Sequence, residues 1–244
     1  MHVEIRGLKK RYGGTPALAD VNLDFPPGRV VALIGLNGAG KTTLLRCLAG
    51  LVSANSGTLR YDGVDFRRDR LDLRRRYFFM PDFPVLYGDM TVLQHVSLLL
   101  RVYGVDAAAV GDPLFHDLAE LDLLPLAEMP LAQVSRGQLY KAALAGLFAV
   151  RPELWLLDEP FASGLDPQGI AVLKQRARTH AAAGGTVVYS TQILEIAERF
   201  CDTLVVIDHG KVVHTFDRTE LSAMPPTGPD SLESRLRQFR EVPT

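Results

Sequence analysis

A glycine-rich segment followed by a lysine and two threonines is the part of the sequence best suited to chemistry. Residues 35–43 read GLNGAGKTT and fit the pattern G-x-x-x-x-G-K-[ST]. In this pattern the glycines let successive backbone N–H groups face one point, where they surround phosphate oxygens. The segment therefore predicts a nucleotide-phosphate site; the alternative is a glycine-rich turn that holds no ligand.

Within this segment the roles differ by residue type. Lys41 is expected to reach the β- and γ-phosphates, and the Thr42 hydroxyl to ligate Mg²⁺. A helix that begins near Lys41 adds the positive end of its dipole. The residues predicted to bind the nucleotide here are Gly35, Leu36, Asn37, Gly38, Ala39, Gly40, Lys41, Thr42 and Thr43.

Two adjacent carboxylates follow the apolar run LWLL at residues 154–157. Asp158 is expected to hold Mg²⁺ through water, as the Walker B aspartate does in P-loop NTPases. Glu159 is placed to orient or deprotonate a water molecule that faces the γ-phosphate. An acidic pair that only caps the next helix is the alternative for such a dipeptide on its own.

Short apolar runs and amphipathic segments alternate along the chain and must position these groups. The apolar runs predict central strands of a parallel sheet, and their alternation with helices predicts a wound α/β layer fold. The predicted strands are Arg29–Ile34, Leu154–Leu157, Thr186–Tyr189 and Leu204–Ile207. The predicted helices are Thr42–Ala49, Gln168–Ala183 and Ile193–Phe200.

Three regions depart from this alternation. The first sixty or so residues alternate in polarity, as antiparallel strands with one wet face do. Residues 91–150 read as helices, with breaks expected at Pro113, Pro125 and Pro130. We therefore expect a core made of residues 1–90 and 151–215, a helical insertion at 91–150, and a tail at 216–244. The tail is expected to hold one helix carrying Leu232, Leu236 and Phe239 behind an Asp230 cap.

Composition excludes several classes of protein. Among the 244 residues, 27 Lys+Arg oppose 28 Asp+Glu, so no basic field is available to hold nucleic acid. The arginine-rich run at residues 67–76 is expected to be a solvated amphipathic helix, a nucleic-acid contact being the alternative. Cys47 and Cys201 suggest neither disulfides nor a metal pair. No apolar stretch approaches the ~18 residues of a membrane span, and the charged amino terminus is not a secretory signal.

Together these motifs resemble the nucleotide-binding subunit of ATP-binding-cassette (ABC) transporters over about residues 2–215. VSRGQ at 134–138 stands where that family has its LSGGQ signature, and ASGLDP at 162–167 looks like its D-loop. The resemblance implies a P-loop NTPase (RecA-like) core with an N-terminal antiparallel β subdomain and an inserted all-helical subdomain. It also implies that Tyr12 stacks on adenine, the alternative being an ordinary edge-strand tyrosine.

The same resemblance implies a head-to-tail dimer around two ATP molecules. Ser135, Gly137 and Gln138 would then bind the γ-phosphate held by a second copy or a homologous cassette, with Asp166 as the D-loop aspartate. The implied partner is a transmembrane permease. This places the chain in the cytoplasm, on the inner face of the cell membrane, and no nucleic acid is expected.

Three positions depart from the family pattern. Asp82 stands where the family has a glutamine that touches Mg²⁺ and the attacking water; a loop shift that leaves Asp82 on the surface is the alternative. Gln192 replaces the switch histidine and cannot carry a proton. Arg136 replaces the first signature glycine and is expected to face solvent or pair with a carboxylate of the facing subunit, with an arginine-finger role as the alternative. We therefore expect an ATPase that is slow but competent.

The expected function is the ATPase subunit of an ABC exporter. Export is suggested by a chain that ends soon after the cassette and by a signature region without the glutamine-arginine tract of importers. The alternatives are a non-hydrolytic regulatory cassette and a soluble non-transport ABC ATPase. Phe83, Val85, Leu86 and Tyr87 are expected to contact the permease, burial inside the helical insertion being the alternative.

Overall fold

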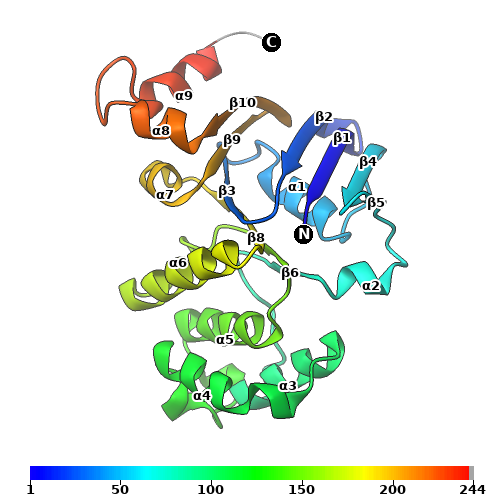
Figure 1. Cartoon of the computed structure of the whole chain (residues 1–244), viewed down its shortest axis with the longest axis vertical. Helices are drawn as coiled ribbons and strands as arrows, with labels where there is room; N and C mark the ends of the chain where they lie inside the picture. The colour runs from blue at the N-terminus through cyan, green and yellow to red at the C-terminus, as the bar shows by residue number, and fades with distance from the viewer. Residues whose placement is uncertain (242–244) are drawn as a thin grey trace.

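The computed structural model describes residues 1–241, and its center is a six-stranded sheet with the order β10-β9-β3-β8-β7-β6 (Figure 1). Its strands are β3 (Arg29–Ile34), β6 (Tyr77–Met80), β7 (Leu154–Leu157), β8 (Thr186–Thr191), β9 (Thr203–Asp208) and β10 (Lys211–Asp217). All neighbouring pairs are parallel except β9 with β10. The predicted α/β fold class is confirmed.

A second, antiparallel sheet lies beside the first. It has the order β2-β1-β4-β5 and is formed by β1 (Val3–Tyr12), β2 (Thr15–Phe25), β4 (Ser56–Tyr61) and β5 (Val64–Asp65). The helix α1 (Lys41–Leu48) packs with both sheets in one hydrophobic cluster. Val31 and Leu33 of β3 belong to that cluster, whereas Val30 and Ala32 face the other helices. Strand alternation thus divides β3 between two cores, because successive side chains point to opposite faces.

Residues 91–150 form a helical subdomain at one end of the long axis of the molecule, and the C-terminal helices lie at the other end (Figure 1). Its α-helices are α3 (Val92–Tyr103), α4 (Gly111–Glu120) and α5 (Arg136–Val150). The 3₁₀ turns η1 (Ala107–Val110), η2 (Leu124–Leu126) and η3 (Leu131–Gln133) connect them. From Tyr140 to Val150 every residue of α5 is buried, so this helix is the core of the subdomain.

The remaining helices pack against the two faces of the parallel sheet. They are α2 (Leu71–Arg74), α6 (Pro167–Ala182), α7 (Leu194–Phe200), α8 (Arg218–Ala223) and α9 (Leu232–Glu241). Residues of α6, α7, α8 and α9 join the cluster on the face of the sheet opposite α1. Among residues 1–241 no helix has both the length and the apolar composition needed to cross a membrane.

The structure corrects several expectations about elements. Strands β6 and β10 extend the sheet beyond the four predicted strands, and β10 takes in Phe216 and Asp217 of the expected tail. Pro113 lies in the first turn of α4 and breaks nothing, since a proline there removes no intrahelical hydrogen bond. The arginine-rich run forms a helix only at Leu71–Arg74.

The tail differs from the prediction of one helix, because α8 precedes α9. A capping box joins Asp217 and Glu220 at the start of α8. At the start of α9 the backbone N–H of Ser234 donates to the Ser231 hydroxyl at 3.4 Å, so Ser231 takes the capping place that was predicted for Asp230. Leu232 and Leu236 are buried as predicted, and the side chain of Phe239 lies outside the described part of the chain.

Candidate functional site

The glycine-rich segment connects the end of β3 to the start of α1, as its pattern predicts. Gly40 caps α1 with φ +111°, and a Cβ at this position would lie 2.6 Å from the Ala17 carbonyl oxygen. Only glycine fits here, since the backbone is left-handed and closely packed. The loop forms one wall of a cavity of about 380 Å³, whose lining also includes Thr42, Asp158 and Gln192.

Lys41 is buried at the floor of this cavity. Its Nζ donates to the backbone oxygens of Gly35 at 2.7 Å and Leu36 at 3.2 Å, and lies 3.5 Å from Glu159 Oε1. The ammonium group is therefore held by carbonyl oxygens and one carboxylate. A phosphate that entered the cavity would offer it stronger, charged hydrogen-bond acceptors.

Thr42 and Asp158 come together as the two motifs predict. The Thr42 hydroxyl donates to Asp158 Oδ1 at 2.9 Å, although the residues are 116 positions apart. The pairing arises because β7 delivers Asp158 at its carboxyl end, two strands from β3 in the same sheet. A hydroxyl and a carboxylate side by side offer hard oxygen ligands, so this donor set fits Mg²⁺.

Glu159 and Gln192 meet over the same cavity. Glu159 has φ +48°, a left-handed conformation that is unusual for a residue with a side chain. Gln192 Nε2 donates to Glu159 Oε1 at 3.3 Å. The turn therefore brings the Glu159 carboxylate between Lys41 and Gln192, where it can face a water molecule next to a bound phosphate.

Asp82 also lines the cavity, and it meets Arg136 of the same chain. Arg136 NH2 lies 3.9 Å from Asp82 Oδ1, and its guanidinium carbon lies 5.3 Å from the center of the Phe83 ring. Arg136 is thus largely exposed, as expected for a side chain that faces solvent, and the carboxylate that it approaches lies within its own chain. Two of the departures from the family pattern contact each other.

The residues of the predicted signature begin α5. Ser135 caps this helix: its hydroxyl accepts from the Gln138 N–H at 3.2 Å, while Gln138 Oε1 accepts from the Ser135 N–H at 2.8 Å. Gly137 packs so closely that a Cβ would lie 2.7 Å from the Gly164 carbonyl oxygen. None of these residues lines the phosphate cavity of the same chain. They form an exposed helix N-terminus, which favours anions.

Asp166 and Tyr12 are likewise absent from the lining of the cavity. Asp166 caps α6 by accepting from the Gly169 N–H at 2.7 Å, and it pairs with the buried Lys141 at 2.7 Å. This bond to Lys141 lowers the pKa of Asp166 below its usual value. Tyr12 is half exposed at the end of β1, with Lys10 Nζ 5.0 Å from the center of its ring.

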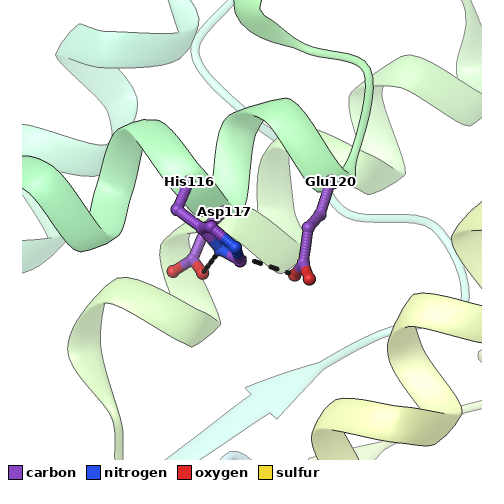
Figure 2. Close-up of side chains that lie close together, drawn as sticks. All are labelled: His116, Asp117 and Glu120. Atoms are coloured by element: carbon purple, nitrogen blue, oxygen red, sulfur yellow. Dashed lines mark ion pairs between the residues drawn. The ribbon is translucent and has the colours of Figure 1, made fainter.

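A cluster of three potential metal ligands lies elsewhere, on α4 (Figure 2). Ligand atoms of His116, Asp117 and Glu120 lie within 4.8 Å of one another. Arg176 of α6 fills this cluster: its guanidinium bonds Asp117, lies 2.5 Å from Glu120 Oε2 and 3.3 Å from His116 Nδ1. The cluster is therefore an ion-pair contact between α4 and α6.

Three residues at or beside the cavity were not predicted. Ala17 and Arg46 line the cavity, and Ser190 of β8 is buried against Asp158, to which it donates at 2.7 Å. Arg46 lies one helical turn beyond Thr42 on α1, so a helical projection of the phosphate motif would have found it. A polar residue at the end of an apolar strand was the available signal for Ser190.

Comparisons with known proteins identify the family. The family model for ABC transporters matches residues 18–162. The chain is 33% identical over 210 residues to the ABC-type transporter ATP-binding protein EcsA of Bacillus subtilis strain 168, covering 86% of this chain and 85% of that protein. It is 38% identical over 218 residues to the sulfate/thiosulfate import ATP-binding protein CysA of Escherichia coli K12, covering 87% of this chain but only 59% of that protein. The Nod factor export ATP-binding protein I of Ralstonia nicotianae is 33% identical over 211 residues, covering 86% of this chain and 65% of that protein.

Solved structures agree with the sequence relatives. An ATP-binding subunit of an ABC transporter superposes with a TM-score of 0.89 at 30% identity, covering 99% of this chain and 100% of that one. A dimeric ATP-binding cassette in a post-hydrolysis state, bound to ADP and Pi, gives a TM-score of 0.78 at 25% identity over 88% of this chain and 98% of that one. The phosphate loop, the paired carboxylates and these similarities lead to one conclusion: the chain belongs to the ABC transporter family, as an ATPase cassette that serves as the ATP-binding subunit of a transporter.

Proposed function

We propose that this cassette binds Mg²⁺·ATP in the cavity lined by the loop between β3 and α1, and that it hydrolyses the ATP to drive a separate transmembrane permease. The observation that supports this most is the convergence of Lys41, Asp158, Glu159 and Gln192 on one cavity beside a phosphate-binding loop. Each of these groups has the chemistry that phosphoryl transfer to water requires.

In this proposal the residues divide the work. Lys41 and the loop N–H groups bind the phosphates, and Thr42 with Asp158 would hold Mg²⁺, with Asp82 as a further oxygen ligand. The metal supplies charge neutralisation at the phosphate oxygens. Glu159 accepts the proton of the attacking water, and Gln192 orients that water by hydrogen bonding. Because Gln192 cannot relay a proton, we expect slow turnover.

We place the γ-phosphate contacts of Ser135, Gly137 and Gln138 across a two-fold dimer of cassettes. Their position at the exposed N-terminus of α5 supports this, since they line no part of the cavity in their own chain. Asp166 would act from the same interface, and Tyr12 would stack on adenine through its exposed ring. A dimeric cassette among the similar structures supports the arrangement.

An apolar groove beside β6 is the proposed contact with the permease. Its volume is about 580 Å³, and its lining includes Leu51, Pro84, Val85 and Tyr87. Val85 is 87% exposed and Tyr87 67% exposed, so the groove presents apolar surface without a partner in this chain. Leu86 lines it from a more buried position, whereas Phe83 lies outside it, beside Arg136.

We also propose export as the direction and the inner face of the cell membrane as the location. The similarity to a Nod factor export protein supports export, whereas the similar CysA proteins are named for sulfate/thiosulfate import. ATP-dependent movement of substrate into inside-out vesicles that contain the permease supports export. Movement out of them contradicts it.

Nucleotide binding by single variants tests the site. Lys41→Ala is expected to weaken ATP binding at least tenfold, measured with a fluorescent ATP analogue, because the buried ammonium group is the main cation of the cavity. Lys211→Ala is the matched control: Lys211 is exposed on β10, outside the cavity lining. Equal affinities for the two variants and the parent would contradict the proposed site.

A further inference from the structure

Ser190 bonds both acidic residues of the proposed site, the side chain of Asp158 and the backbone of Glu159, and no motif accounts for it. Strand β8 runs parallel to β7 with Leu157 opposite Tyr189, and β8 continues to Thr191. This register carries Ser190 one step past the last residue of β8 that pairs with β7, next to Asp158 and Glu159. The side chain is fully buried.

The hydroxyl of Ser190 makes two hydrogen bonds, one with each acidic residue. It donates to Asp158 Oδ1 at 2.7 Å and accepts from the backbone N–H of Glu159 at 2.9 Å. A hydroxyl has one proton to donate and lone pairs to accept with. Alanine at this position could do neither, and both partners would lose the hydrogen bond that the buried hydroxyl gives them.

The second bond matters because of the conformation that it holds. Glu159 has φ +48°, and a residue with a side chain keeps such a conformation only when its surroundings fix it. Its N–H is tied to Ser190, and the left-handed turn directs its carboxylate to Lys41 and Gln192. The first bond meanwhile fixes the Asp158 oxygen that also accepts from Thr42.

We propose that Ser190 is a positioning residue that couples the metal-binding carboxylate of Asp158 to the water-activating carboxylate of Glu159. It is buried and does not line the cavity, so it acts through the two residues it holds. The inference rests on the proposed ATP hydrolysis for its effect on rate. The hydrogen bond to Glu159 is a property of the nucleotide-free chain and can be tested without turnover.

Three variants of the full chain separate the hydroxyl from packing. Ser190→Ala removes both bonds, and Ser190→Thr keeps a hydroxyl at the same carbon. Thr186→Val is the matched control, since Thr186 is also fully buried on β8 but donates its hydroxyl to the Met1 carbonyl oxygen at 2.7 Å, at the other end of the strand.

Two measurements are made on each variant: kcat and KM for ATP, and hydrogen exchange of the Glu159 amide without nucleotide. Ser190→Ala is expected to lower kcat about tenfold with KM within about twofold, and to speed exchange at Glu159 about tenfold or more. Ser190→Thr is expected to restore both values toward those of the parent. Thr186→Val should leave both unchanged.

The proposal is overturned if Ser190→Ala leaves either the exchange rate or kcat at the parent value, or if Ser190→Thr behaves like Ser190→Ala in both. Failure of the proposed function gives a different pattern. In that case phosphate release by the parent is absent or insensitive to Glu159→Gln, while the exchange of the Glu159 amide still shows whether Ser190 holds the turn.

Discussion

At the scale of single residues, Gln192 is the change that most affects the expected rate. It lies 3.3 Å from Glu159 through its amide nitrogen, so it can bond the carboxylate but cannot take or give a proton. Gln192→His should raise kcat about tenfold, because an imidazole adds acid–base capacity near neutral pH. Steady-state phosphate release measures this, and Gln192→Ala, expected to fall below the parent, is the control. A Gln192→His enzyme no faster than the parent would show that the glutamine does not limit turnover.

Asp82 and Arg136 form the second residue-scale test. They lie 3.9 Å apart and are both more than half exposed, so the pair itself adds little stability. If the two are coupled in ATP turnover, Asp82→Gln and Arg136→Gly should each change kcat. The kcat of the double variant should then differ at least threefold from the value obtained by multiplying the two single fold-changes. A double-variant cycle on phosphate release measures the coupling. Strictly multiplicative effects would mean that the two positions act separately.

The sequence identified some of the residues that lie at this cavity and missed others, for a physical reason. Lys41, Thr42, Asp158 and Glu159 were found because each stands in a local motif whose spacing the backbone itself requires. Contacts that depend on strand register cannot be recognised this way. Ser190 is an example: its partners lie 31 and 32 positions away along the chain.

At the scale of elements, one ion-pair cluster joins the helical subdomain to the core. Arg176 of α6 contacts Asp117 and Glu120 of α4, and Asp117 is only 4% exposed. Arg176→Met should lower the free energy of unfolding by about 2 kcal/mol at pH 7, because it leaves a buried carboxylate unpaired. Urea unfolding measures this. Arg199→Met is the control: its exposed partner is Glu195, so a change within about 0.5 kcal/mol is expected.

The loss of stability caused by Arg176→Met should depend on pH in a defined direction. Burial raises the pKa of Asp117 above its ordinary value in the folded state, and Arg176 opposes that rise. Without Arg176 the folded-state pKa of Asp117 rises further, so at pH values above that pKa the ionised carboxylate lowers the free energy of unfolding. As the pH falls through the folded-state pKa, Asp117 takes up a proton and this loss of stability becomes smaller. The destabilisation by Arg176→Met should therefore be smaller at pH 5 than at pH 7; a difference that does not change with pH would contradict the role of Asp117.

The elements that the sequence predicted share one property. Strands such as β3 and β7 are short, apolar and buried on both faces, so their residue types identify them without tertiary information. Strand β10 was missed because four of its seven residues are exposed and it pairs with β9 at the edge of the sheet. Helix α8 was also missed, although the capping box of Asp217 and Glu220 was visible in the sequence.

At the scale of the whole molecule, we propose that two copies of the chain together complete the site. With hydrolysis blocked by Glu159→Gln, Mg²⁺·ATP should convert the protein from monomer to dimer, since each ATP would join the loop of one chain to Ser135 of the other. Adding Ser135→Arg, which places a bulky side chain at that contact, should prevent the conversion while ATP binding persists. Sedimentation velocity with and without ATP measures this. A dimer that forms equally well with Ser135→Arg would place the interface elsewhere.

Phosphate release by the parent and by Glu159→Gln, measured side by side with the permease present, tests the central claim most directly. Glu195→Gln, an exposed glutamate on α7, is the control for the loss of one carboxylate. The account predicts slow but continuous release by the parent and by Glu195→Gln, and a loss of at least a hundredfold in Glu159→Gln with ATP still bound. Equal release by the parent and Glu159→Gln, or no release by a parent that binds ATP, would contradict it.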